Sequence, residues 1–74
     1  GEYRRKIRMK FKEYLEKCRN SVRVHVYFNA FNVQCEAKWS TGHWRRSGSE
    51  LLDREVDGIW TKDGYLCVTL KEED

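Results

Sequence analysis

Two stretches of strict alternation between apolar and polar residues, joined by four residues, constrain this chain more than any other feature. Every second residue is apolar from position 22 to 28 and again from 33 to 39. A period of two is the pattern of a β-strand with one buried face. Asn29 and Asn32, at the ends of the joining segment, are typical turn residues. The sequence therefore predicts a β-hairpin over residues 22–39.

A four-residue loop from Asn29 to Asn32 sets the register expected for this hairpin. On the buried face it pairs Phe28 with Val33, Val26 with Cys35 and Val24 with Ala37. On the other face it pairs Tyr27 with Gln34, His25 with Glu36 and Arg23 with Lys38. Every apolar residue then falls on one side of the sheet, so the register is self-consistent.

The segment before the hairpin favours an amphipathic helix over residues 2–19. At about 100° per residue, six apolar positions share one stripe. They are Tyr3, Ile7, Phe11, Tyr14, Leu15 and Cys18. The competing interpretation is a strand, because residues 7–12 also alternate, but it accounts for fewer apolar positions. Asn20-Ser21 is the expected stop.

The last third of the chain contains two Asp-Gly pairs, Asp57-Gly58 and Asp63-Gly64. Asp-Gly is a strong signal for a two-residue hairpin turn. Two such turns predict a three-stranded meander over residues 52–70, followed by an acidic tail at 71–74. A short helix over residues 49–57 is the alternative.

The meander places its aliphatic residues on one face and its aromatic residues on the other. Leu52, Val56, Ile59, Leu66, Val68 and Leu70 are expected on the buried face. Trp60, Tyr65 and Cys67 are expected on the outer face, where Tyr27 of the hairpin also lies. Tyr27, Trp60 and Tyr65 form either a platform for a ligand or an interface for a partner or a second copy.

These elements predict one small α+β domain spanning residues 1–74. An N-terminal amphipathic helix would pack on an antiparallel sheet of about five strands, with residues 40–49 as a loop. No apolar run approaches the roughly 20 residues that span a bilayer. The 3 cysteines are odd in number and widely spaced, which favours free thiols and a cytoplasmic or nuclear location.

Charge is distributed unevenly along the chain. Residues 1–46 hold 12 Lys and Arg against 4 Asp and Glu, whereas residues 47–74 hold 3 against 8. A local field of this size steers charged partners. The alternative is that the two halves attract each other within the fold.

Two basic segments are the candidate binding residues. In the first, Arg4, Arg5, Arg8 and Lys12 lie on the polar side of the expected helix, and in the second Arg45 and Arg46 follow Trp44 in the loop. Cations that neutralise phosphates favour nucleic acid. An aromatic residue beside them can stack on an unpaired base. Trp44 has a second interpretation, in which it folds over an edge of the sheet.

The leading hypothesis is a binding module without catalytic activity, for RNA or single-stranded nucleic acid. The alternative is a protein-interaction domain that docks an acidic partner, or itself, through the outer sheet face. Anionic lipid is a third hypothesis. We expect no metal, because the Cys and His residues lack the close spacing of zinc ligands, and no cofactor, because no phosphate-binding glycine-rich loop is present. The combination of His25 with Glu36 and a thiol is a weak signal for catalysis.

Overall fold

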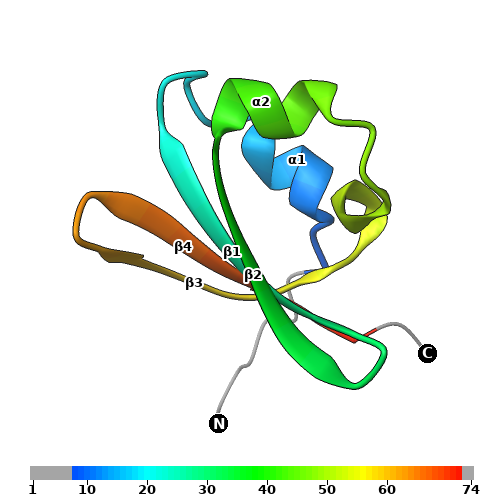
Figure 1. Cartoon of the computed structure of the whole chain (residues 1–74). Helices are drawn as coiled ribbons and strands as arrows, with labels where there is room; N and C mark the ends of the chain where they lie inside the picture. Colours follow the sequence, from blue (N-terminus) through cyan, green and yellow to red (C-terminus); the bar gives the residue numbers. More distant parts are fainter. Residues whose placement is uncertain (1–7, 73–74) are drawn as a thin grey trace, which may run out of the picture.

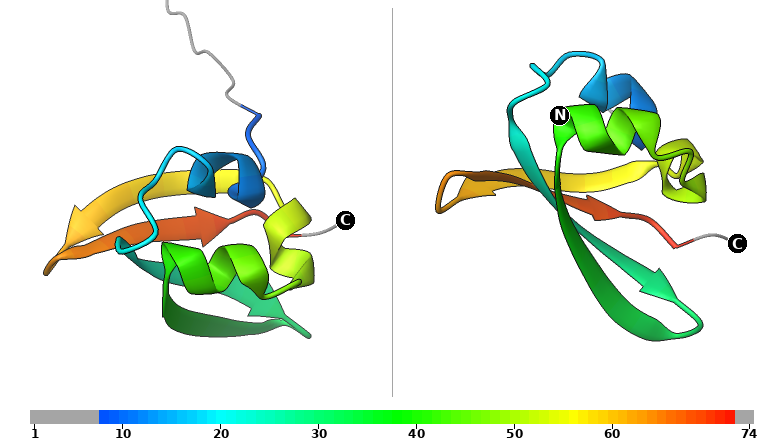
Figure 2. Two further views of the ribbon diagram at one scale, coloured as in Figure 1. Left: turned by 90° about the horizontal axis from the view of Figure 1, so that it is seen from above. Right: turned by 45° about the horizontal axis from the view of Figure 1, so that its top comes forward.

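The structure is a computed structural model that describes residues 8–72. Its sheet has four strands: β1 (Arg23–Ala30), β2 (Val33–Ser40), β3 (Val56–Lys62) and β4 (Tyr65–Leu70). Three short helices accompany the sheet: α1 (Phe11–Leu15), α2 (Thr41–Arg46) and the 3-10 helix η1 (Glu50–Asp53). All three helices lie on one face of the sheet (Figures 1 and 2). The α+β class is confirmed.

The strand order is β2-β1-β4-β3, and the sheet is mixed. β1 and β4 are parallel in the centre, whereas β2 and β3 pair antiparallel with them at the edges. The predicted sheet of about five antiparallel strands is therefore wrong. The segment expected to supply the fifth strand begins in η1, where the Ser49 hydroxyl accepts a hydrogen bond from the Leu51 amide at 3.1 Å, and it ends in the first residue of β3, Val56. The helical alternative for this region is the closer one.

The hairpin of β1 and β2 is confirmed, but its register differs from the expected one by two residues. Ala30 pairs with Val33, so the turn contains only Phe31 and Asn32. Both turn residues have positive φ, at 52° and 64°, as a two-residue turn of the hairpin type requires. A shift of two keeps each side chain on its face, so the predicted buried face is preserved.

The segment before the hairpin is helical for only part of the predicted range. Within residues 8–19 the helix spans Phe11–Leu15, and its start is fixed by the Glu13 carboxylate, which accepts a hydrogen bond from the Lys10 amide at 2.8 Å. Before it, Lys10 forms an antiparallel bridge with Glu55. The competing strand interpretation over residues 7–12 is not borne out either, because among residues 8–12 only Lys10 forms such a bridge and the helix begins at Phe11. Residues 2–7 of the predicted helix lie outside the described range.

The core lies between the helices and the inner face of the sheet. Phe11 and Leu15 of α1, Trp44 of α2 and Leu51 of η1 pack against the two central strands. The strand residues of this core are Val24, Val26, Val68 and Leu70. The opposite face of the sheet, which no helix covers among residues 8–72, is called the outer face below.

The two Asp-Gly pairs behave differently. Asp63 and Gly64 form the tight turn between β3 and β4, with φ of 52° and 82°, as predicted. Gly58 lies within β3, next to a register shift between Val56 and Gly58, so the first pair makes no turn. From Ile59 onward the faces of β3 and β4 match the prediction.

Candidate functional site

The centre of the outer face carries a stack of three rings, here called the aromatic stack: Trp60, Tyr27 and His25. The Trp60 and Tyr27 ring centroids are 5.6 Å apart at an interplanar angle of 14°, and those of Tyr27 and His25 are 4.3 Å apart at 26°. Cys67 pairs with both Trp60 and His25 in the sheet and is buried. Trp60, at the end of the stack, is 41% exposed.

Hydrogen bonds hold the imidazole of His25 in this stack. Its Nε2 lies 2.7 Å from Oε1 of Glu36, and its Nδ1 lies 3.4 Å from the Tyr27 hydroxyl. The predicted contact between His25 and Glu36 is therefore present, although they are diagonal rather than opposite in the ladder. Partial burial raises the pKa of Tyr27, and the Cys67 thiol and the Glu36 carboxylate act in the same direction. The stack is thus a small, internally bonded cluster.

Three cations surround Tyr65 at one end of the outer face, and we call Arg23, Lys38 and Lys62 the cationic row. The Lys38 Nζ lies 5.3 Å from the Tyr65 ring centroid, and the Arg23 guanidinium carbon lies 5.9 Å from it. Lys62 is the direct partner of Tyr65 across the β3–β4 turn. The row draws on β1, β2 and β3 because β1 and β4 run parallel and begin at the same end of the sheet.

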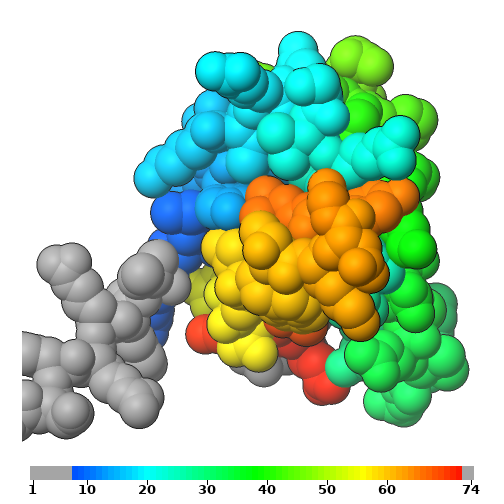
Figure 3. Space-filling model, turned by 90° about the vertical axis from the view of Figure 1, so that its left-hand side faces the viewer, coloured from blue at the N-terminus to red at the C-terminus, as the bar shows by residue number. Residues whose placement is uncertain are grey.

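Figure 3 looks onto this end of the molecule. The turn of the β3–β4 hairpin (orange) is exposed directly below the segment that leads into β1 (cyan). Asp63 in the turn adds one negative charge beside Lys62. The arrangement exposes a cluster of positive side chains around an aromatic ring.

Glu55 and Glu72 lie at the opposite end of the strands, where Glu55 forms an ion pair with Lys71 at 3.5 Å. β3 begins beside the end of β4, where the Lys71 amide donates to the Glu55 carbonyl at 2.9 Å. At the same end, Asn29 donates from Nδ2 to Glu72 Oε2 at 2.8 Å. Glu55 and Glu72 therefore lie away from the cationic row, whereas Asp63 is the acidic residue beside it.

The prediction that Trp44 stacks on a base is wrong. Its exposed fraction is 0%, and its indole N–H donates to the Val24 carbonyl at 3.3 Å. Its ring meets Phe11 edge-on at 5.2 Å between centroids. Residues 41–46 form α2 instead of a loop, because the Ser40 hydroxyl accepts a hydrogen bond from the His43 amide at 3.2 Å and caps the helix. Trp44 is a core residue.

The predicted cations are not all available to a ligand in the same way. Lys12 forms an ion pair with Asp53 at 3.0 Å, and this hydrogen bond raises the pKa of Lys12 and lowers that of Asp53. Arg45 donates to the side-chain oxygen of Asn20 at 3.2 Å. Arg46 is exposed on α2. These residues lie on the helical side of the molecule, away from the aromatic stack.

Arg8, the remaining predicted cation in the described range, is exposed just before the bridge that joins Lys10 to Glu55. Arg4 and Arg5 lie outside residues 8–72. A continuous basic helix face is therefore not part of the described structure.

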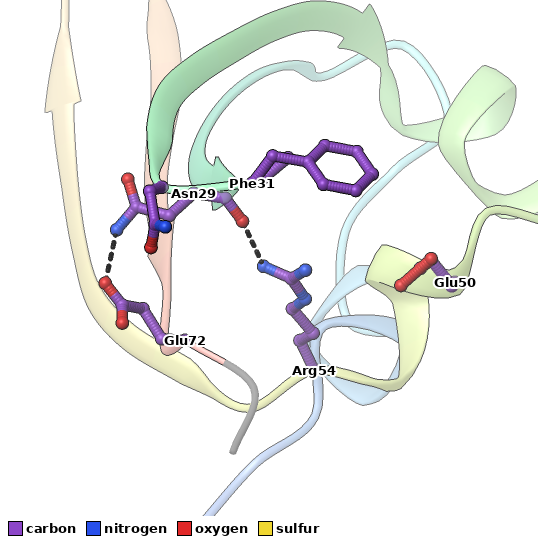
Figure 4. A pocket seen from close by; sticks show the side chains of 7 residues that line it. Asn29, Phe31, Glu50, Arg54 and Glu72 are labelled. Atoms are coloured by element: carbon purple, nitrogen blue, oxygen red, sulfur yellow. Dashed lines mark hydrogen bonds between the residues drawn. The ribbon is translucent and has the colours of Figure 1, made fainter.

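A cavity of about 380 Å³ lies beside the tip of the β1–β2 hairpin (Figure 4). Its wall includes Phe31, Glu50 and Arg54. Arg54 donates from Nη1 to the Asn29 carbonyl at 3.0 Å. The polar groups of the wall therefore serve to join the hairpin to the segment after η1.

The other features of residues 8–72 concern metal clusters, free thiols and membrane spans. No group of three or more His, Cys, Asp or Glu side chains there could hold a metal ion. Cys18, Cys35 and Cys67 are free thiols, and burial raises the pKa of Cys18. No helix in this range has the length and apolar character to cross a bilayer.

The residues that sequence reasoning missed are those of the cationic row. Tyr27, Trp60 and Tyr65 were expected on the outer face, and the structure brings them within one cluster. Lys38 and Lys62 are far apart in the sequence, and only the pairing of β1 with β4 brings them to one end. A search against protein-family models, curated proteins and solved structures found no match to this chain.

Proposed function

We propose that this domain binds single-stranded nucleic acid, with RNA as the expected ligand, through the outer face of its sheet. The observation that carries the proposal is the cationic row around Tyr65, beside the exposed ring of Trp60. Phosphates bind Lys and Arg, while unpaired bases stack on aromatic side chains. This face offers both within one cluster.

The geometry of the aromatic stack limits how many bases it can hold. One face of the Tyr27 ring is covered by Trp60 and the other by His25. Trp60 stacks on Tyr27 with one face only, and it is 41% exposed. We therefore expect one base on Trp60, an interaction that is typically worth about 1–3 kcal/mol.

The charge distribution supports this location. The cationic row attracts a phosphate backbone, whereas at the other end of the strands Glu55 forms an ion pair with Lys71 at 3.5 Å and Glu72 accepts a hydrogen bond from Asn29. Such a field orients an approaching anion before contact. A bound strand would therefore lie across the end of the sheet that holds Tyr65.

A salt titration tests the proposal. The ligand is a fluorescent oligouridylate of about ten nucleotides, a length within the site size of small single-strand-binding domains. We expect the affinity to fall with salt. Arg23→Ala/Lys62→Ala should reduce the log–log slope by about 0.7 for each phosphate that the variant no longer neutralises. The matched control is Arg45→Ala/Arg46→Ala, which removes the same charge from α2.

The outcomes separate the two surfaces. Weaker binding in the Arg23/Lys62 variant alone supports the outer face. An equal loss of affinity in both variants, or an affinity that does not respond to salt, contradicts it. A loss of affinity only in the Arg45/Arg46 variant would indicate that the binding site lies on the side of the molecule that carries the helices.

A second candidate function is docking of an acidic protein segment on the same face. It is favoured by the covered faces of Tyr27, because a surface with one free ring offers little room for successive bases. A polyglutamate peptide is the probe for this function. If the domain binds this peptide and oligouridylate does not displace it, the result would favour docking of an acidic protein segment.

A further inference from the structure

The two edges of the sheet differ in how they are protected. β3 has a register shift between Val56 and Gly58, and a bulge of this kind discourages pairing with another strand. β2 pairs with β1 without interruption over eight residue pairs. The chain contains no proline, so neither of these devices protects the outer edge of β2. In the part of the chain that the structure describes, β2 ends the sheet.

Exposed apolar side chains accompany this open edge. Phe31 is 97% exposed, Val33 is 59% exposed and Trp39 is 38% exposed. The φ of 52° at Phe31 belongs to the two-residue turn. The ring is almost fully exposed and adds little to the packing of one copy, so it is free to contact a second copy.

The backbone of β2 has peptide groups available for pairing. In an antiparallel ladder, hydrogen-bonded and non-bonded pairs alternate. A two-residue turn closes on a bonded pair, which here is Ala30 with Val33. The peptide groups of Glu36 and Lys38 therefore point away from β1, toward the open edge.

The charges of β2 select one register for pairing with a second copy of itself. With Ala37 of both copies on a twofold axis, Glu36 of each copy lies opposite Lys38 of the other. A shift of two residues in one direction places Glu36 opposite Glu36, and in the other direction Lys38 opposite Lys38. Opposite charges across a ladder stabilise it and like charges destabilise it, so only the first register is favoured.

We propose that this domain forms a twofold-symmetric dimer by antiparallel pairing of β2 with β2, with Ala37 at the axis. The two four-stranded sheets then form one continuous sheet. Cys35 of each copy lies opposite Trp39 of the other and reduces its exposure. Gln34 lies opposite Ser40, the last residue of β2, so Val33 and Phe31 lie toward the start of the other copy's α2. The proposal is independent of the proposed function.

The first experiment uses the unmodified protein. One strand pair buries less area than a standard interface, so we expect weak association, in the range of about 10 µM to about 1 mM. Sedimentation equilibrium over this range should show a monomer and dimer. Amide hydrogen exchange at Glu36 and Lys38 should slow as the concentration rises, whereas exchange at Ala37 should change little. A mass that stays monomeric to about 1 mM would overturn the proposal.

The second experiment reverses the charges. Glu36→Lys and Lys38→Glu each place like charges opposite each other twice in the dimer, and each should weaken it by about tenfold or more. The double variant Glu36→Lys/Lys38→Glu restores the opposite charges and should restore the dimer. Lys62→Glu on β3 is the matched control and should leave the dimer intact.

The double variant also addresses folding. Each single variant removes an interaction within one copy, since Glu36 bonds His25 and Lys38 lies over Tyr65. The double variant removes both of these interactions, so recovery of its dimer can only come from pairing between copies. A wild-type dimer that the single variants leave unchanged, or that the double variant fails to restore, would overturn the proposal.

Discussion

Trp44 of α2 packs on the inner side of the sheet and Trp60 of β3 lies on its outer face, and the difference between them separates folding from binding. Trp44 on the inner side is fully buried and donates its indole N–H to Val24. Trp60 on the outer side is 41% exposed and stacks on Tyr27. The basic residues next to Trp44 in the sequence suggested a ligand contact, yet the ring is part of the core. Proximity to cations in the sequence is thus a poor guide to exposure.

The largest expected effect is on the inner face. Trp44→Ala should reduce the free energy of unfolding by about 3–5 kcal/mol, the usual cost of removing a buried aromatic side chain. A domain of this size is stable by only about 4–11 kcal/mol, so the variant should be close to unfolding. Urea denaturation followed by circular dichroism measures this. A cost below about 1 kcal/mol would show that the ring is not in the core.

Trp60→Ala should reduce the stability of the domain less than Trp44→Ala does, and it should reduce the affinity for the ligand. Removal of one ring pair is expected to reduce stability by about 0.5–1.5 kcal/mol in addition to the effect of reduced burial. The affinity for oligouridylate should fall roughly 5- to 150-fold, the equivalent of one stacked base. Fluorescence anisotropy on the folded variant measures this. An unchanged affinity would remove Trp60 from the site.

A smaller effect is expected on the reactivity of the Cys67 thiol, which lies beneath the aromatic stack. Cys67 is 1% exposed, under the rings of the outer face, whereas Cys18 and Cys35 are partly exposed. With a disulfide reagent in native buffer, Cys18 and Cys35 should react before Cys67. Trp60→Ala should speed the reaction of Cys67 alone. Equal rates for all three thiols in the native protein would show that the stack does not shield the strand below it.

The smallest effect concerns the ion pair on the helical side. The hydrogen bond with Lys12 lowers the pKa of Asp53 from its usual 3.8 and raises that of Lys12 from its usual 10.5. Because its pKa is lower in the folded protein, Asp53 stabilises the fold at pH values above its pKa in the unfolded chain. This contribution is lost as the pH falls through the pKa of Asp53 in the folded protein. Lys12 stabilises the fold at pH values below its pKa in the unfolded chain. This contribution is lost as the pH rises through its raised pKa in the folded protein.

Asp53→Asn should therefore be slightly less stable than the wild type at neutral pH, because pairs this exposed contribute little. The difference in urea midpoint should disappear in acid below the pKa of Asp53. A difference that persists at low pH would have a cause other than the ion pair.

Much of the fold could be predicted from local patterns. The alternation around Val24 and Val26 identified the hairpin and its buried face, and Asp63-Gly64 identified the last turn. The hairpin register could not be predicted, because Phe31-Asn32 lacks the glycine that usually marks a two-residue turn. Helix α2 was missed because its cap, Ser40, lies in a stretch rich in loop-forming residues.

The candidate site was only partly predictable. The period of two placed Tyr27, Trp60 and Tyr65 on one face, as found. The cationic row depends on the parallel pairing of β1 with β4, a contact between distant segments that no local pattern encodes. The strand pairing also places Glu55 and Glu72 at the end of the sheet away from the row, which charge counts along the chain could not show.

The most direct test of the outer face is a nuclear magnetic resonance titration of the ¹⁵N-labelled protein with oligouridylate. We predict progressive shifts at the indole of Trp60 and at the amides of Arg23, Lys38 and Tyr65, with little change at Arg45 and Arg46. Shifts centred on α2, or no shifts at concentrations where the strand is in excess, would contradict the account.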